Sequence, residues 1–188
     1  MITIVSGIPR SGTSLMMQML SAGGMETLTD GLRTPDPNNP RGYYELELVK
    51  SLAKNPEMLA QAENKAVKVV SSLLEFLPQK HEYRIIFMRR ALEEIVASQD
   101  RMLQRLGRDV PPAPKASVMA AFEKHLQRVT RWLSEQSNMT VLYVNYSGLL
   151  EDTKPEVLRI RNFLGRALDS RAMEGKVEKS LHREKASA

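Results

Sequence analysis

The feature that most constrains the fold lies at the start of the chain, where the apolar residues 2–6 run directly into the loop GIPRSGTS at residues 7–14. Behind this loop, four apolar side chains recur at helical spacing: Leu15, Met16, Met19 and Leu20. This pattern predicts a buried strand, a glycine-rich turn and a helix in direct succession. The backbone N–H groups of such a turn point inward at a helix N-terminus, so we expect the loop to bind an anion such as phosphate.

The loop departs from the usual phosphate-binding pattern, G-x-x-x-x-G-K-[ST]. Thr13 stands at the lysine position, and Arg10 supplies a cation inside the loop instead. A site for Mg-ATP also uses an aspartate at the end of a strand, and none of the predicted strands ends in one. The loop therefore favours an anion that arginine and hydrogen bonds neutralise. A tight turn with a helix cap is the alternative.

Strands and helices alternate along the rest of the chain. Apolar runs predict strands at residues 66–70, 83–88 and 140–145, and helical spacing predicts helices at residues 92–106, 115–136 and 155–164. Residues 43–65 are predicted to form one or two helices that break near Pro56. This order predicts an α/β fold with a mainly parallel sheet, formed by a single domain over residues 1–188 with a polar C-terminal tail at residues 171–188.

A second candidate anion site follows the strand at residues 83–88. Arg90 lies at the start of the next helix, and Ser98 lies two turns further along roughly the same helix face. A cation and a hydroxyl on one ridge can hold a phosphate. The alternative is that Arg89 or Arg90 pairs with Glu93 or Glu94 on the helix surface.

The composition narrows the classes of partner and site. The 188 residues include no cysteine and three scattered histidines, so we expect no metal site and a reducing, cytoplasmic location. No apolar run is long enough to span a bilayer, so we expect no membrane partner. The net charge of +5 suits an anionic ligand, but the basic residues form no tract, which argues against nucleic acid. The sequence does not indicate an oligomeric state.

Together, the two motifs resemble the sulfotransferase superfamily. The loop Pro9-Arg10-Ser11-Gly12-Thr13-Ser14 matches the family's 5′-phosphosulfate loop, and Arg90 with Ser98 matches its 3′-phosphate site. Residues 142–165 are similar to the late strand, tyrosine-containing turn and FLG-ended helix of bacterial sulfotransferase-like proteins and of the tyrosylprotein sulfotransferase branch. The resemblance implies a three-layer sandwich of the P-loop NTP hydrolase type.

The resemblance also implies a reaction and a set of ligands. The donor would be 3′-phosphoadenosine-5′-phosphosulfate (PAPS), the product 3′-phosphoadenosine-5′-phosphate (PAP), and the acceptor a hydroxyl or amine of a small molecule or peptide. Pro9 to Ser14, Arg90 and Ser98 would bind the donor, and no metal is needed.

In the tyrosylprotein branch the catalytic base is a glutamate, and its position falls here on Asp30, while the branch's substrate-binding arginine falls on Arg33. Lys68 is the best match for the lysine that steadies the transferring group, and Arg10 would share this role. Asp30 has an alternative role as a turn residue, in which case Glu26 or Glu45 would be the base. Tyr43, Tyr44 and Glu45 would line the acceptor pocket or cap the next helix.

Two other functional classes stay open from the sequence. One is a kinase that uses the loop with ATP. The other is a non-catalytic nucleotide-binding protein that keeps the loop and has lost the base, which would bind PAP without turning PAPS over.

Overall fold

The computed structural model describes residues 1–34, 36, 39, 42–107 and 113–178. Its centre is a five-stranded sheet in the order β2-β3-β1-β4-β5, in which every neighbouring pair is parallel. The strands are β1 (Ile2–Gly7), β2 (Thr27–Leu28), β3 (Ala66–Lys68), β4 (Tyr83–Arg89) and β5 (Met139–Asn145). The predicted α/β fold with a mainly parallel sheet is confirmed. The sequence missed only β2, because two residues are too few to show a period.

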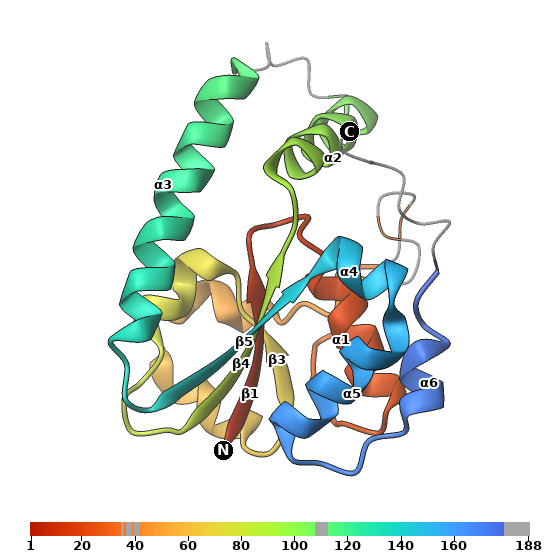
Figure 1. The fold of residues 1–188 in the computed structure, drawn as a ribbon. Coiled ribbons are helices and arrows are strands. Elements are labelled where there is room, and N and C mark those ends of the chain that lie inside the picture. Colours follow the sequence, from red (N-terminus) through yellow and green to blue (C-terminus); the bar gives the residue numbers. More distant parts are fainter. Residues whose placement is uncertain (35, 37–38, 40–41, 108–112, 179–188) are drawn as a thin grey trace.

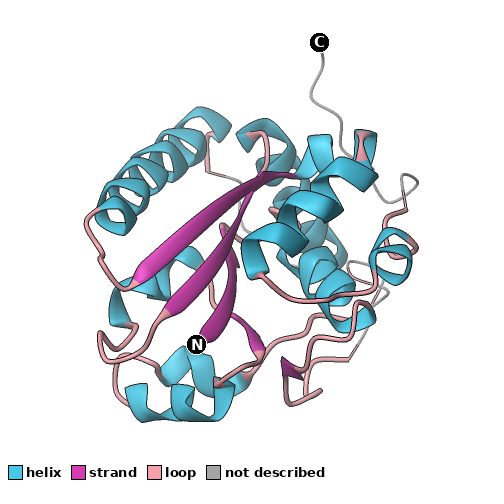
Figure 2. Cartoon of the chain, turned by 60° about the horizontal axis from the view of Figure 1, so that its bottom comes forward, coloured by secondary structure: helices cyan, strands magenta, loops and turns pink. Residues whose placement is uncertain are grey.

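Helices cover both faces of the sheet and make it the middle of three layers (Figures 1 and 2). On one face lie α1 (Thr13–Ala22), α4 (Tyr146–Glu151), α5 (Thr153–Leu164) and α6 (Ser170–Glu174). On the other lie the short 3₁₀ helices η1 (Glu47–Ser51), η2 (Pro56–Ala62) and η3 (Ser71–Phe76), together with α3 (Lys115–Ser134). Helix α2 (Leu92–Arg105) stands beyond the carboxyl end of β4 (Figure 1).

Alternation along β1 divides the core in two. Ile2 and Ile4 pack with η1–η3 and α3, whereas Val5 packs with α1 and α5, because successive side chains of a strand point to opposite faces. All three side chains are fully buried. The strand is thus apolar on both faces, as a parallel sheet covered by helices requires.

Two parts of the predicted organisation are corrected. Residues 43–65 form two helical segments that are interrupted before Pro56, as expected, but both segments, η1 and η2, are short 3₁₀ helices. Part of the predicted polar tail is folded, because α6 starts at Ser170 and buries Met173 completely against the α1 side of the core. The rest of that tail, residues 179–188, lies outside the described residues.

The sheet places its functional edge at the carboxyl ends of β1, β3 and β4. The chain leaves β1 for α1 on one face and leaves the neighbouring β3 for η3 on the other. Diverging connections of this kind open a crevice between the two strand ends, which is where open α/β sheets bind ligands.

Candidate active site

A cavity of about 610 Å³ opens at this edge. Its walls combine the first loop, the end of β3, the segment before η1, helix α2 and the start of α4. Most of the residues that the sequence singled out line it: Pro9, Arg10, Gly12, Thr13, Ser14, Arg33, Tyr43, Glu45, Lys68, Arg90 and Ser98. Ser11, Asp30 and Tyr44 do not.

The glycines of the first loop are required by close contacts. A Cβ on Gly12 (φ 101°) would lie 2.5 Å from Cδ2 of Tyr146, and one on Gly7 (φ 148°) would lie 2.4 Å from Oγ of Ser11. Both residues also have a positive φ that other residues rarely adopt. Arg10 shares this left-handed conformation, with φ 76°, which costs energy for a residue with a Cβ.

Ser11 faces away from the cavity that the rest of the loop lines. Its N–H donates to the carbonyl of Ile8 at 3.1 Å, and its hydroxyl is buried with no hydrogen-bond partner among the described residues. The loop residues with hydroxyls at the cavity are Thr13 and Ser14.

The two predicted anion sites meet at Arg10. Its Nε donates to the hydroxyl of Ser98 at 3.0 Å, and its carbonyl accepts a hydrogen bond from Nη1 of Arg90 at 3.2 Å. The predicted pairing of Arg90 with Glu94 also exists, at 2.7 Å, but both side chains are less than a tenth exposed. The pair is therefore a buried clamp that holds Arg90 at the cavity, and not a surface ion pair.

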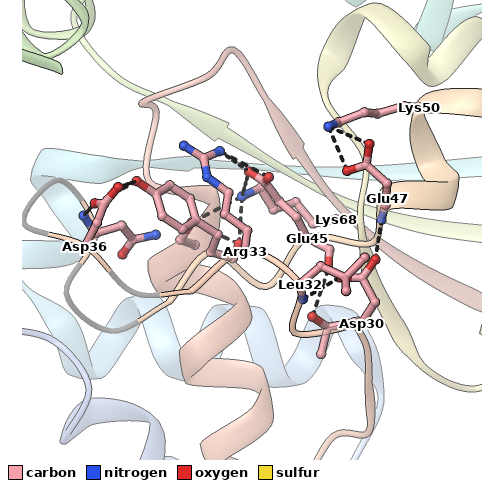
Figure 3. Close-up of polar contacts among 12 residues, drawn as sticks. Asp30, Leu32, Arg33, Asp36, Glu45, Glu47, Lys50 and Lys68 are labelled. Carbon is pink, nitrogen blue, oxygen red and sulfur yellow. Dashed lines mark hydrogen bonds and ion pairs between the residues drawn. The ribbon is translucent and has the colours of Figure 1, made fainter. Parts of the chain in front are cut away.

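A second polar cluster joins Lys68 to the segment that precedes η1 (Figure 3). The Lys68 ammonium donates to the carbonyl of Tyr43 at 2.8 Å, to Oε1 of Glu45 at 3.2 Å and to the hydroxyl of Ser14 at 3.2 Å. Glu45 in turn accepts from Nη1 of Arg33, and the Arg33 guanidinium lies 3.4 Å above the Tyr43 ring. Lys68 thus links the first loop directly to a carboxylate.

The local charges keep this cluster ionised. Burial alone would raise the pKa of Glu45, but the charges and hydrogen bonds of Lys68 and Arg33 outweigh burial and hold the pKa below its usual value. Burial lowers the pKa of Lys68, and the Glu45 carboxylate opposes part of that shift. Burial likewise lowers the pKa of Arg10. A carboxylate, an ammonium and a guanidinium therefore share one partly desolvated site.

Asp30, at which the resemblance placed the base, is not among the residues that line the cavity. Its carboxylate accepts the backbone N–H groups of Leu32 at 3.0 Å and of Glu47 at 2.6 Å, apart from the Glu45 cluster (Figure 3). These two hydrogen bonds, that of Glu47 first, lower the pKa of Asp30. The geometry is that of a turn and helix-capping residue, the alternative left open by the sequence.

Two more predicted residues fall outside the cavity. Glu26 pairs with Lys65 at the surface. Tyr44 adopts a left-handed conformation with φ 51°, and this turn separates the Tyr43 carbonyl from the Glu45 carboxylate so that both reach Lys68. Arg41, which precedes Tyr43 in the sequence, lies outside the described residues.

Sequence reasoning did not select Tyr146, the first residue of α4. Its ring lines the cavity, packs against Gly12 and lies 4.5 Å from the Arg90 guanidinium. The available signal was its place directly after the strand-ending Asn145, at the same sheet edge as the loop.

Among the described residues, no group of three or more His, Asp or Glu side chains is placed to hold a metal ion. Within the same ranges, no helix has the length and apolar character needed to cross a bilayer.

One protein-family model matches nearly the whole chain. The model of the sulfotransferase domain family matches residues 2–185. The chain belongs to the sulfotransferase family. This confirms the resemblance that its two motifs suggested, while the assignment to the tyrosylprotein branch stays a prediction. No curated protein matches this sulfotransferase.

Solved structures share the fold at low sequence identity. A sulfotransferase domain from the curacin biosynthetic pathway is 14% identical, with a TM-score of 0.57 over 94% of this chain and 77% of that one. Retinol dehydratase, in complex with androsterone and the inactive cofactor PAP, is 17% identical, with a TM-score of 0.53 over 93% of this chain and 62% of that one. A mouse sulfotransferase complexed with PAP is 19% identical, with a TM-score of 0.53 over 94% of this chain and 62% of that one. The sulfotransferase described here thus spans less than two thirds of the last two chains.

Proposed function

We propose that this sulfotransferase transfers a sulfuryl group from PAPS to a hydroxyl or amine of an acceptor. The observation that carries the proposal is the contact of Arg10 with both Ser98 and Arg90, which brings two anion-binding motifs into one cavity. A donor with phosphate groups on both the 3′ and 5′ positions needs two such motifs. Retinol dehydratase and the mouse sulfotransferase, both solved with PAP, support the same donor.

The residues present fit this donor. The loop amides, with Thr13 and Ser14, would hold the 5′-phosphosulfate at the N-terminus of α1, because this end of a helix favours anions. Arg90 and Ser98 would hold the 3′-phosphate, and the Arg10 side chain lies between the two groups of residues. Bound donor supplies an activated sulfuryl group, and the cavity residues act on the charges around it.

Glu45 is the carboxylate best placed to act as the base. Its side chain lines the cavity, and Lys68 and Arg33 favour its ionised form. Lys68 also donates to Ser14 and so connects Glu45 to the first loop. Glu45 would accept the acceptor's proton as the new S–O bond forms and the bond from sulfur to the 5′-phosphate oxygen breaks. Lys68 and Arg10 would neutralise the charge on the sulfuryl oxygens and on the departing phosphate. Asp30 is set aside as the base because both of its oxygens serve the backbone.

The other two classes fit the cavity less well. The carboxylates that line it in the described ranges are Glu45, paired with Lys68, and Glu178, so no aspartate is placed there to hold the magnesium of ATP. In a non-catalytic protein the half-buried Lys68–Glu45 pair at the cavity would have a structural role alone. The absence of cysteine fits the cytoplasmic location expected from the sequence.

The proposal is tested by comparing nucleotides that differ in the 3′-phosphate. PAP should raise the thermal midpoint more than ADP does, because only PAP engages Arg90 and Ser98 in addition to the loop. The Arg90→Gln variant should lose this preference and keep the ADP response. Labelled PAPS, screened against a panel of acceptors, then reports turnover. Equal midpoint shifts from PAP and ADP would contradict the donor assignment.

A further inference from the structure

We propose that the acceptor is a small hydroxyl compound with an apolar body and a carboxylate or similar anionic group, and that Arg33 binds this anion. This inference rests on the proposed function, since it concerns the acceptor half of the same cavity. It is carried by the hydrogen bonding of Arg33 and by the apolar side chains that line the same cavity.

Arg33 offers unused donors beside the candidate base. It lines the cavity and its side chain is 46% exposed. Within the described part of the chain, its only hydrogen-bond and ion-pair partner is Glu45, and both contacts use the single nitrogen Nη1, at 3.1 and 3.2 Å. The other two nitrogens of its guanidinium are left for a ligand. A guanidinium presents its donors as a planar fork, which matches a carboxylate.

The Arg33 guanidinium is also held in place. It stacks on the ring of Tyr43 at 3.4 Å, and the Tyr43 hydroxyl donates to Asp36 at 2.8 Å. Such stacking fixes the plane of the fork before a ligand arrives, so less freedom is lost on binding. An arginine needed only to neutralise Glu45 would not require this support, because Lys68 already pairs with Glu45.

Apolar side chains from four separate elements indicate that the acceptor has an apolar body. The wall is formed by Leu46 and Val49 at η1, Leu73 on η3, Met102 on α2 and Phe122 on α3. A cavity with apolar walls and few convergent polar groups suits a compact organic molecule. The cavity of about 610 Å³ must also hold the donor, so the space left beside the donor suits a small acceptor.

The charges explain why this anion needs Arg33 in particular. An acceptor with a carboxylate brings a second negative charge close to Glu45, and two neighbouring carboxylates repel. Arg33, already in contact with Glu45, is placed to neutralise both. Without it, binding of a charged acceptor near Glu45 should be weakened more than binding of a neutral acceptor of the same shape.

The test compares acceptors that differ only in this charge. The probes are 4-hydroxyphenylacetate with its neutral amide, and 6-hydroxyhexanoate with its neutral amide. For each, kcat/KM is measured with labelled PAPS, and Kd is measured on the PAP-loaded protein. If Arg33 donates a charge-assisted hydrogen bond to the carboxylate of the acceptor, the wild type should prefer at least one acid over its amide by about tenfold or more.

Variants of Arg33 assign the preference to this residue. Arg33→Gln should lower the ratio of acid to amide, in Kd on the PAP-loaded protein and in kcat/KM, by about tenfold or more, and Arg33→Lys should retain part of the preference. Lys54→Gln removes an exposed cation away from the cavity and should change neither acceptor. Thermal midpoints of the variants check that each one folds.

The possible failures are distinguishable. If PAP does not bind and PAPS is not consumed, the proposed function fails. If PAP binds but acids and amides behave alike, or neither kind binds, the acceptor assignment is wrong and the donor assignment stands. An acid preference that Arg33→Gln leaves intact would also overturn it, as would turnover of a tyrosine peptide in place of all four probes.

Discussion

Nε of Arg10 and the hydroxyl of Ser98 lie 3.0 Å apart, although 88 residues separate them in the chain. This contact joins the loop after β1 to the second turn of α2, so the two candidate anion motifs lie side by side in one cavity. Replacing Ser98 by Ala should therefore weaken PAP binding by about tenfold to hundredfold, in line with the loss of a hydrogen bond to a charged group. Calorimetric titration measures the change. Ser117→Ala, at an exposed position of α3, is the control, and equal PAP affinities of the two variants would argue against a role for Ser98.

Substitutions of Glu45 and of Asp30 are expected to differ in their effect on turnover. Glu45→Gln should lower kcat by about 10²–10⁴-fold, the usual contribution of a general base, while PAP still binds. Asp30→Asn should keep most of the activity, because Asp30 serves the backbone of Leu32 and Glu47. Single-turnover measurements with labelled PAPS separate the chemical step from product release. Loss of turnover in Asp30→Asn with normal turnover in Glu45→Gln would reverse the assignment.

The pKa of Glu45 sets the pH dependence. Lys68 and Arg33 hold this pKa below its ordinary value of 4.5, so the acid limb of kcat/KM should lie below pH 4.5. The same shift stabilises the native state above the unfolded pKa, and this contribution is lost as the pH falls through the folded pKa. The difference in unfolding free energy between wild type and Glu45→Gln should thus shrink on acidification. A difference that stays constant from pH 6 to pH 3 would contradict the ion pair.

Two separate effects should make Gly12 hard to replace: its positive φ and the lack of space for a Cβ. Gly24 has the positive φ alone, so a substitution there measures the backbone effect by itself. Both have a positive φ, 101° and 93°, but a Cβ at Gly24 meets nothing within 4 Å, whereas one at Gly12 collides with Tyr146. Gly24→Ala should cost about 1–2 kcal/mol from backbone strain alone. Gly12→Ala should cost about 1–3 kcal/mol more, because the collision adds an overpacking penalty. Urea denaturation measures both, and equal losses would show that Tyr146 moves aside freely.

The buried pair of Arg90 with Glu94 predicts a large effect on stability. Glu94→Gln removes the Glu94 carboxylate from a pair in which both side chains are less than a tenth exposed, and breaking a buried pair costs about 3–5 kcal/mol. Glu93→Gln, one residue earlier on the exposed face of α2, should cost little. Denaturation of the two variants under the same conditions gives the comparison. A small loss for Glu94→Gln would mean that Arg90 is neutralised by other groups.

The sequence by itself determined most of the longer elements and indicated the two candidate anion motifs, because these depend on local order. An apolar run, two glycines and a helical stripe suffice to predict strand, turn and helix, and the spacing of Arg90 and Ser98 corresponds to about two helical turns. Only the tertiary structure decided which carboxylate meets Lys68. Asp30 and Glu45 lie on one irregular connection without a period, and the left-handed turn at Tyr44 directs Glu45 inward while the backbone N–H groups of Leu32 and Glu47 retain Asp30. Contacts between separate segments also placed Tyr146 against Gly12 and buried Glu94, and neither was readable from local spacing.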